Sequence, residues 1–244
     1  MTGAPKALVP AFVLHRRRYG DRSLLLELFT LDRGRLPAVA RGAAAAGSRR
    51  RGVLQPFIPL LVGWRGRGEV LTLTRAEAAG RAPPLQGRSL YCGFYLNELL
   101  QRLWPREEPA AVLFEAYGAT LAALAAGEPQ APLLRRFELT LLRELGQAPE
   151  LTRDAAGHPL ASEGRYRLEE GRGLVRLRDT EAGGYPGALL LALAEGRSPP
   201  SGAGAREARR FLQQLIEPLL GGRPLKSRAL FRTMAPSSAA ARQS

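Results

Sequence analysis

Hydrophobic and polar positions before residue 80 follow patterns typical of β-strands. Apolar, β-favouring runs cover 7–15, 23–30, 35–40 and 53–64, and residues 69–74 have the two-residue period of a strand. Stretches with turn residues separate these runs at 19–21, 31–34 and 65–68. About five short strands in so short a segment predict a small closed or partly open β-barrel.

The period lengthens to that of a helix after Pro83 and Pro84. Residues Leu96, Leu99, Leu100 and Leu103 share one helical face, and similar apolar stripes mark helices over 112–125, 134–145 and 208–219. Such stripes indicate core packing rather than a cofactor site. The polar, Gly-rich stretch 152–179 contains two short extended pieces, at 165–168 and 174–177, which predict a small β insertion.

These patterns predict an α+β multidomain chain. Its N-terminal part, residues 1–80, is expected to be an OB-fold β-barrel, the five-stranded type of this size. The C-terminal helical domain is expected in two parts, 81–150 and 183–236, on either side of the β insertion at 151–182. Residues 237–244 have the composition of a flexible tail.

The charge of the chain points to a polyanionic partner. Lys and Arg number 36 against 22 Asp and Glu, which gives a net charge of +14. A GC-rich genome would explain why Lys6 and Lys226 are the only lysines. It would not explain why acidic residues fail to balance the arginines, so we favour nucleic-acid binding.

The arginines gather where a barrel would bind a strand, in the loops and on one sheet face. Guanidinium groups pair with phosphates and stack on bases, and exposed aromatic rings stack as well. The predicted DNA-binding residues are Arg16, Arg17, Arg18, Tyr19, Arg35, Arg41, Arg49, Arg50, Arg51, Trp64, Arg65 and Arg67, with Arg49–Arg51 expected in a loop before the fourth strand.

Catalytic chemistry has few candidate residues. His15 follows an apolar run beside three arginines, His158 lies in the insertion, and Cys92 is the only thiol. The chain lacks the Gly-rich loop with Lys and Ser or Thr that would bind ATP phosphates. We therefore expect no enzyme activity and no cofactor. A single cysteine and the lack of a long apolar run favour the cytoplasm.

Short motifs along the chain resemble the RecO family. They are Tyr19-Gly20-Asp21, Leu28-Phe29-Thr30, Ala40-Arg41-Gly42, Leu54-Gln55-Pro56-Phe57, Tyr95-Leu96-Asn97-Glu98-Leu99-Leu100, Phe137-Glu138-Leu139 and Pro224-Leu225-Lys226-Ser227-Arg228. Each motif alone is a weak signal, but all of them occur in the same order as in the family, which makes the match specific. The resemblance implies a recombination mediator of DNA repair that binds single- and double-stranded DNA and anneals complementary strands. With RecR it would help load RecA onto DNA coated by single-strand-binding protein, in association with the nucleoid.

One departure from the family concerns zinc. Relatives with a zinc finger carry two Cys-x-x-Cys pairs in the insertion, and the matching places here fall near Arg153, Ala156, Val175 and Arg178. None of these residues is Cys or His, so a tetrahedral thiolate site cannot form. We expect a zinc-finger-like insertion without metal.

The resemblance also implies contacts with protein partners through the helical domain. Arginines beside the apolar stripes would suit an acidic tail that ends in apolar residues, although they also suit the wet faces of ordinary amphipathic helices. The candidate partner-binding residues are Arg102, Arg106, Arg135, Arg136 and Arg143. An RNA-binding or ribosome-associated OB protein remains an alternative, and a nucleic-acid hydrolase with an unrecognised metal site is a remoter one.

Overall fold

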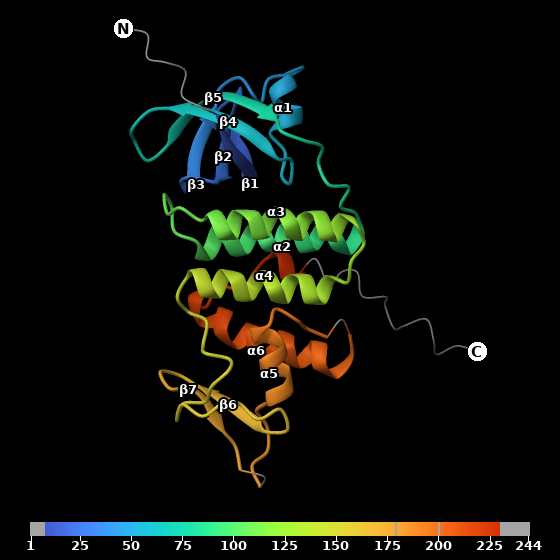
Figure 1. Cartoon of the computed structure of the whole chain (residues 1–244). Coiled ribbons are helices and arrows are strands. Elements are labelled where there is room, and N and C mark those ends of the chain that lie inside the picture. The colour runs from blue at the N-terminus through green and yellow to red at the C-terminus, as the bar shows by residue number, and fades with distance from the viewer. Residues whose placement is uncertain (1–7, 179, 200, 230–244) are drawn as a thin grey trace, which may run out of the picture. The chain divides into compact units, whose positions relative to one another are not determined.

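The computed structural model describes residues 8–178, 180–199 and 201–229, and its elements are labelled in Figure 1. The chain divides into two compact units. The first unit combines Met1–Pro109 with Arg223–Ser244, and the second is Ala110–Gly222. The expected tail, 237–244, lies outside the described residues.

The first unit begins with a closed barrel whose strand order is β1-β2-β3-β5-β4. Neighbouring strands are antiparallel except β3 and β5, which are parallel. Pairing of β1 with β4 closes the barrel, and this five-stranded closed architecture confirms the expected OB-type fold class. The strands are β1 (Val9–Tyr19), β2 (Ser23–Thr30), β3 (Gly34–Ala40), β4 (Leu60–Arg65) and β5 (Leu71–Ala78).

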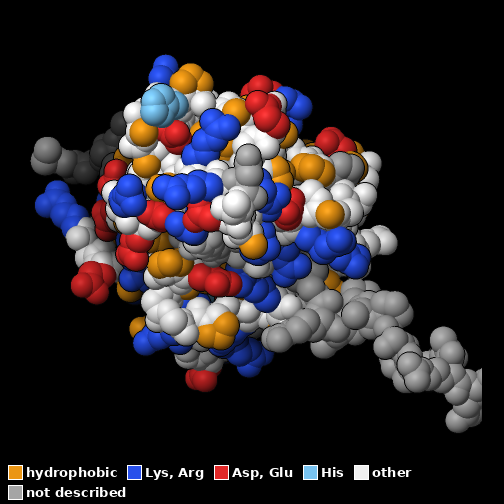
Figure 2. All heavy atoms as spheres, turned by 90° about the horizontal axis from the view of Figure 1, so that it is seen from below, with side chains coloured by type: hydrophobic (Ala, Val, Ile, Leu, Met, Phe, Trp, Pro, Cys, Tyr) orange, Lys and Arg blue, Asp and Glu red, His pale blue; other side chains and the backbone are white. Residues whose placement is uncertain are grey.

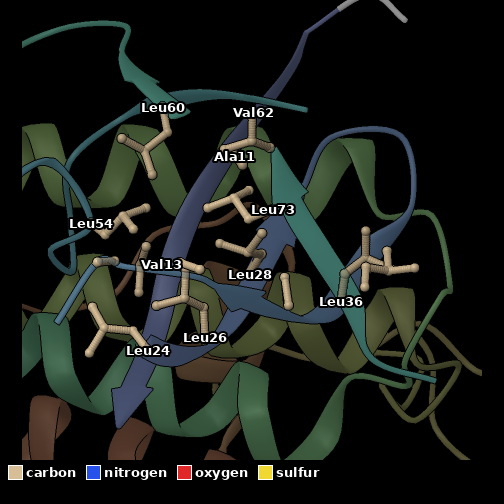
Figure 3. Close-up of a cluster of buried hydrophobic side chains, with 14 of the residues drawn as sticks. Ala11, Val13, Leu24, Leu26, Leu28, Leu36, Leu54, Leu60, Val62 and Leu73 are labelled. Atoms are coloured by element: carbon tan, nitrogen blue, oxygen red, sulfur yellow. The ribbon is translucent and has the colours of Figure 1, made fainter. Parts of the chain in front are cut away.

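The barrel interior is filled by one side of each strand. Along β2, Leu24, Leu26 and Leu28 are buried, whereas the residues between them are half-buried. Figure 3 shows these leucines in one cluster of buried side chains with Leu36 of β3 and Val62 of β4. The two-residue hydrophobic period of the sequence therefore corresponds to the inside of the barrel.

The segment between β3 and β4 differs from the sequence prediction. A short helix, α1 (Arg49–Val53), occupies the place where a loop was expected, and the strand predicted over 53–64 begins only at Leu60. Pro56 and Pro59 interrupt the extended chain, and Phe57 has a positive φ of 71°. The Phe57 ring is buried and lies 5.2 Å from the Phe94 ring, so packing stabilises this uncommon backbone conformation.

Helix α2 (Gly87–Leu103) packs against the barrel in the same unit. The pairing of β1 with β2 shifts register between Val13 and His15, which leaves the Leu14 carbonyl without a ladder partner. Asn97 and Gln101 of α2 donate side-chain hydrogen bonds to that carbonyl, at 2.8 and 3.2 Å. The bulge of β1 thus becomes the attachment point of the helix.

Arg35 of β3 binds the C-terminal end of α2. Its guanidinium donates to the carbonyl oxygens of Leu100 at 3.2 Å, Gln101, and Trp104 at 2.5 Å. It also pairs with Glu27 at 2.9 Å. The last carbonyls of a helix have no partner within the helix and carry partial negative charge, so a cation here stabilises the helix end. Arg35 is therefore a joint between barrel and helix.

Gly34 allows the chain beyond α2 to approach this joint. Its φ is +59°, and a Cβ atom at this position would lie 1.8 Å from the carbonyl oxygen of Glu108. Any side chain would therefore push the 104–108 segment away from β3.

The chain returns to the first unit after the second unit is complete. Glu98 of α2 accepts hydrogen bonds from the backbone N–H groups of Lys226 (2.8 Å) and Ser227 (2.7 Å) and from the Ser227 hydroxyl (2.6 Å). Arg102 donates to the Arg223 carbonyl oxygen at 3.0 Å. Two motifs that lie far apart in the sequence are thus hydrogen-bonded to each other.

The second unit is mainly helical, with a small sheet of order β7-β6-β8. Helices α3 and α4 pack together, with the Tyr117 and Phe137 rings in an edge-on arrangement. The sequence predicted α3, α4 and α6 but not the short α5. The elements are α3 (Ala111–Ala125), α4 (Gln130–Glu144), β6 (Arg165–Glu169), β7 (Gly173–Arg176), β8 (Tyr185–Pro186), α5 (Gly187–Ala194) and α6 (Gly202–Leu219).

Candidate nucleic-acid interface

The last residues of β1 are basic and open to solvent. Arg17 and Arg18 are exposed, and Arg16 is half-buried where its strand leaves the barrel core. The Arg16 guanidinium donates to the carbonyl oxygens of Arg51 (3.3 Å) and Leu54 (3.1 Å), at the end of α1. This contact brings the arginines of β1 and those of α1 to the same end of the barrel.

Arg50 attaches α1 to the other side of the barrel end. It donates to the carbonyl oxygens of Leu73 and Thr74 on β5, at 3.3 and 3.4 Å. Because Arg16 and Arg50 bind backbone on both sides, Arg49 and Arg51 are left exposed on a fixed helix. We call the group Arg16, Arg17, Arg18, Arg49, Arg50 and Arg51 the basic barrel end.

The electrostatics of the basic barrel end favour an anion. Partial burial lowers the pKa of Arg16, and the nearby positive charge of Arg51 lowers it further. Among the described residues, no carboxylate lies within 4.0 Å of the six guanidinium groups. Arginine stays charged in spite of such shifts, so an incoming phosphate would relieve the repulsion.

Other predicted DNA-binding residues lie around the barrel. Tyr19 is 53% exposed at the turn after β1. Arg41 is exposed after β3, in a loop tied to the β1–β2 turn by a hydrogen bond from the Ala44 N–H to the Arg22 carbonyl. Arg65 and Arg67 are exposed at the β4–β5 connection. Sequence reasoning missed Val70 of this connection, which is 49% exposed.

Two predicted residues have structural contacts instead of an open position. Trp64 is half-buried and packs against the barrel core. Arg35 is only 12% exposed and is engaged by Glu27 and the end of α2. Glu27 also accepts from Arg106, at 3.3 Å, so the three side chains form one network.

The predicted partner-binding arginines fall in different units. Arg102 and Arg106 belong to the first unit, where they contact Arg223 and Glu27. In the second unit, Arg135 is buried and pairs with the buried Glu138. Arg136 and Arg143 are exposed.

Arg143 borders a pocket of the second unit. Its guanidinium donates to the Ala194 carbonyl at 3.0 Å. The pocket has a volume of about 450 Å³ and is also lined by Pro149, Glu150, Leu151 and Thr152. It therefore combines a cation and a carboxylate with apolar wall residues.

Hydrogen bonds and packing hold the segments of the insertion together. The Asp154 carboxylate accepts from the backbone N–H groups of Ala156 and His158, both at 2.9 Å. The Ala155 N–H donates to the Leu174 carbonyl at 2.7 Å, which connects this turn to β7. Tyr166 is buried, and its hydroxyl accepts from the Ala161 N–H at 2.7 Å. Within the described ranges, no three His, Cys, Asp or Glu side chains gather as metal ligands would.

Two arginines of the insertion are matched by carboxylates. Arg167 and Arg172 both pair with Glu169, at 2.9 and 2.7 Å, and Arg167 also approaches Glu181 at 3.7 Å. A hydrogen bond from Arg167 lowers the pKa of Glu169, and the charge of Arg172 adds to this effect. Figure 2, viewed from the side of the insertion, shows acidic side chains lying among the basic ones.

The barrel and its contacts define the class of the protein: an OB-type barrel with a strongly basic end, joined to a helical unit. Family models narrow this class. "Recombination protein O N terminal" matches residues 6–81, and "Recombination protein O C terminal" matches residues 84–229. The chain belongs to the RecO family of DNA repair proteins.

Curated relatives agree over nearly their whole length. The chain is 45% identical to the DNA repair protein RecO of Halorhodospira halophila, over 92% of this chain and 96% of the relative. It is 46% identical to that of Methylococcus capsulatus (91% and 92%) and 47% to that of Stutzerimonas stutzeri (93% and 94%). This membership confirms the resemblance, and a family of DNA repair mediators agrees with the expectation that the chain is not an enzyme.

In the part of the chain that the structure describes, no helix is both long and apolar enough to cross a bilayer.

Proposed function

We propose that the chain is a recombination mediator that binds single- and double-stranded DNA through the basic barrel end and anneals complementary strands. With RecR, it helps load RecA onto DNA coated by single-strand-binding protein, in the cytoplasm at the nucleoid. The observation that carries the DNA-binding step is the convergence of β1 and α1 arginines without a neighbouring carboxylate among the described residues. The family supports the repair role.

The contacts suggest a division of labour within this interface. Arg17, Arg18, Arg49 and Arg51 are exposed and suit direct contact with phosphates. Arg16 and Arg50 bind backbone carbonyls and position α1. Exposed residues around the barrel, Tyr19, Arg41, Arg65 and Arg67, would extend the path of the strand, with Tyr19 stacking on a base.

Protein partners belong to the same proposal. The pocket beside Arg143 and the exposed Arg136 suit an acidic tail with apolar residues, as single-strand-binding protein would have to offer. The contacts of Arg102, Arg106 and Arg135 within the fold make them weaker candidates for this role.

The test of DNA binding is the salt dependence of affinity for a labelled oligo(dT) strand, measured by anisotropy with the full chain. Each phosphate contact contributes about 0.7 to the log-log slope on single strands. We expect the double substitution Arg17→Ala/Arg18→Ala to reduce the slope by about 1.4. The control, Arg167→Ala/Arg172→Ala, removes two exposed arginines that pair with Glu169, and should reduce it by less than about 0.5.

Two results would contradict the proposal. Equal reductions in both variants would mean that net charge alone drives binding, and an unchanged slope in a folded Arg17/Arg18 variant would place the footprint elsewhere. Parallel measurements with oligo(rU) and an annealing assay separate the DNA mediator from an RNA-binding protein. Preference for RNA without DNA annealing would favour the latter.

A further inference from the structure

Two arginines of the second unit converge on one backbone oxygen. Arg165 of β6 donates from Nη2 to the Gly184 carbonyl at 3.1 Å, and Arg210 of α6 donates to the same oxygen at 3.2 Å. Arg165 also donates from Nε to the Gly183 carbonyl at 2.8 Å. Two positive groups are therefore held close together by a neutral acceptor.

The backbone that holds this pair is rigid. Gly184 has a φ of +65°, and a Cβ atom there would lie 2.7 Å from the Tyr166 carbonyl oxygen. Tyr185 is buried, its ring is edge-on to Phe211 at 5.0 Å, and its hydroxyl donates to Gln214 at 2.8 Å. Arg210 lies over this ring, 4.9 Å from its centre, so its guanidinium is fixed in orientation.

The surrounding surface continues the positive charge. Arg206 and Arg209 are also exposed on α6, and Arg206 lies three positions before Arg209 and four before Arg210, the spacings at which side chains are neighbours on a helix. Within the described residues, no carboxylate lies within 4.0 Å of Arg165, Arg206, Arg209 or Arg210, although the partly buried Glu207 is next to Arg206 in sequence. Like charges three and four positions apart destabilise a helix unless an anion offsets them.

We propose that Arg165, Arg206, Arg209 and Arg210 form a second nucleic-acid site, which binds the phosphate backbone of a strand and lies on a different unit from the basic barrel end. Arg165 and Arg210 supply fixed guanidinium groups with donors left over, as a phosphate requires. Arg206 and Arg209 extend the contact along α6. A chain with sites on both units binds two strands, or two parts of one strand, at once.

The test uses the full chain with Arg206→Glu/Arg209→Glu, because both side chains are exposed and their loss leaves the fold intact. Its control is Arg172→Glu/Arg197→Glu, which changes charge equally at exposed arginines that pair with Glu169 and Glu195. Each of these two double substitutions is made in the wild-type chain and also in a chain that carries Arg17→Ala/Arg18→Ala. The probe is an oligo(dT) strand with photoreactive thymines, read by salt titration and by mapping of crosslinked peptides.

We expect the α6 pair to reduce the log-log salt slope by at least about 1.4 in both backgrounds, and crosslinks within 183–210 to disappear. The control pair should reduce the slope much less. Equal effects of both pairs, or no crosslink to 183–210 in the wild-type chain, would overturn the second site while leaving the barrel interface intact. An effect of the α6 pair without any effect of Arg17 and Arg18 would overturn the barrel interface instead, and a wild-type chain that binds no strand would overturn both. Protection of the site by a polyglutamate peptide but not by oligo(dT) would assign it to an acidic protein.

Discussion

The barrel and the insertion both carry many arginines, but these arginines have different neighbours. At the basic barrel end, Arg16 and Arg50 bind backbone carbonyl oxygens, and their neighbours Arg49 and Arg51 face solvent. In the insertion, by contrast, Arg167 and Arg172 are matched to Glu169. A carbonyl orients a guanidinium without cancelling its charge, whereas a carboxylate cancels it.

The difference teaches that the number of arginines in a segment is a poor guide to its affinity for phosphate. A salt-bridged arginine must break a contact before it binds a ligand, and an arginine oriented by a carbonyl does not. The same distinction applies within the second unit, where Arg165 and Arg210 share a carbonyl while Arg167 has carboxylate partners. Three predictions test this contrast.

The largest effect is expected where a barrel arginine is part of the fold. Arg35→Ala removes the partner of Glu27 and of three helix-end carbonyls, so we expect the free energy of unfolding to fall by about 3 kcal/mol. The salt slope of DNA binding should stay the same. Denaturant unfolding and anisotropy measure the two quantities.

The exposed Arg41→Ala is the matched control, with a change of stability within about 0.5 kcal/mol. If Arg35→Ala instead left stability unchanged and reduced the slope, Arg35 would belong to the interface and not to the joint.

A smaller effect is expected in the insertion, where we expect hydrogen bonds and packing to take the place of a metal. Tyr166→Phe leaves the ring buried but removes the acceptor for the Ala161 N–H. We expect it to lower the free energy of unfolding by about 1 kcal/mol, with no further change on chelation. Urea denaturation with and without EDTA measures this, and Tyr19→Phe at an exposed ring is the control. Bound zinc, or destabilisation of the wild-type chain by EDTA, would show that metal holds the insertion after all.

The smallest effect is expected on the local stability of the insertion at low pH. Hydrogen bonds from Thr152 lower the pKa of Glu150, those from the His158 and Ala156 amides lower that of Asp154, and Arg167 lowers that of Glu169. A lowered pKa contributes stability above the unfolded value, and this contribution is lost as pH falls through the folded value. Relative to the intrinsic rate at the same pH, amide exchange at Thr152 and His158 should therefore accelerate below about pH 4, before that of the barrel strands.

Exchange rates measured by NMR at several pH values test this order. In the variant Glu169→Gln, amide exchange near β6 should depend less on pH, because the titrating carboxylate is gone. Simultaneous acceleration in barrel and insertion would mean that these carboxylates do not stabilise the insertion selectively.

Local patterns in the sequence were sufficient to predict most of the fold. The alternation around Leu24, Leu26 and Leu28 placed β2 correctly, because one side of a barrel strand is always buried. Helix α1 was missed because a run of three arginines has no apolar period. The position of α1 depends on two hydrogen bonds between residues that are distant in sequence, from Arg16 to the Leu54 carbonyl and from Arg50 to the Leu73 carbonyl. Local patterns do not contain such contacts.

The sequence was sufficient to predict which charged residues lie around the barrel, but not which of them bind other parts of the fold and which face solvent. Glu27 and Arg35 both interrupt apolar strands that pair through a short turn, and their register places them diagonally opposite on one face. That pattern could have indicated an ion pair rather than a DNA contact. No sequence pattern indicated that Arg165 and Arg210 bind the same Gly184 carbonyl. Their meeting depends on how α6 packs against β8 through Tyr185.

The hydrogen bonds between Glu98 and Lys226–Ser227 have a consequence for chain connectivity. The second unit is inserted into the sequence of the first: the chain leaves the first unit after Pro109 and returns to it at Arg223. The two units are therefore joined by two covalent connections, one after Pro109 and one before Arg223. Cleavage at Gly222 alone would leave the units tethered, and a chain truncated before Arg223 would deprive Glu98 of its partners while every residue of the barrel remained.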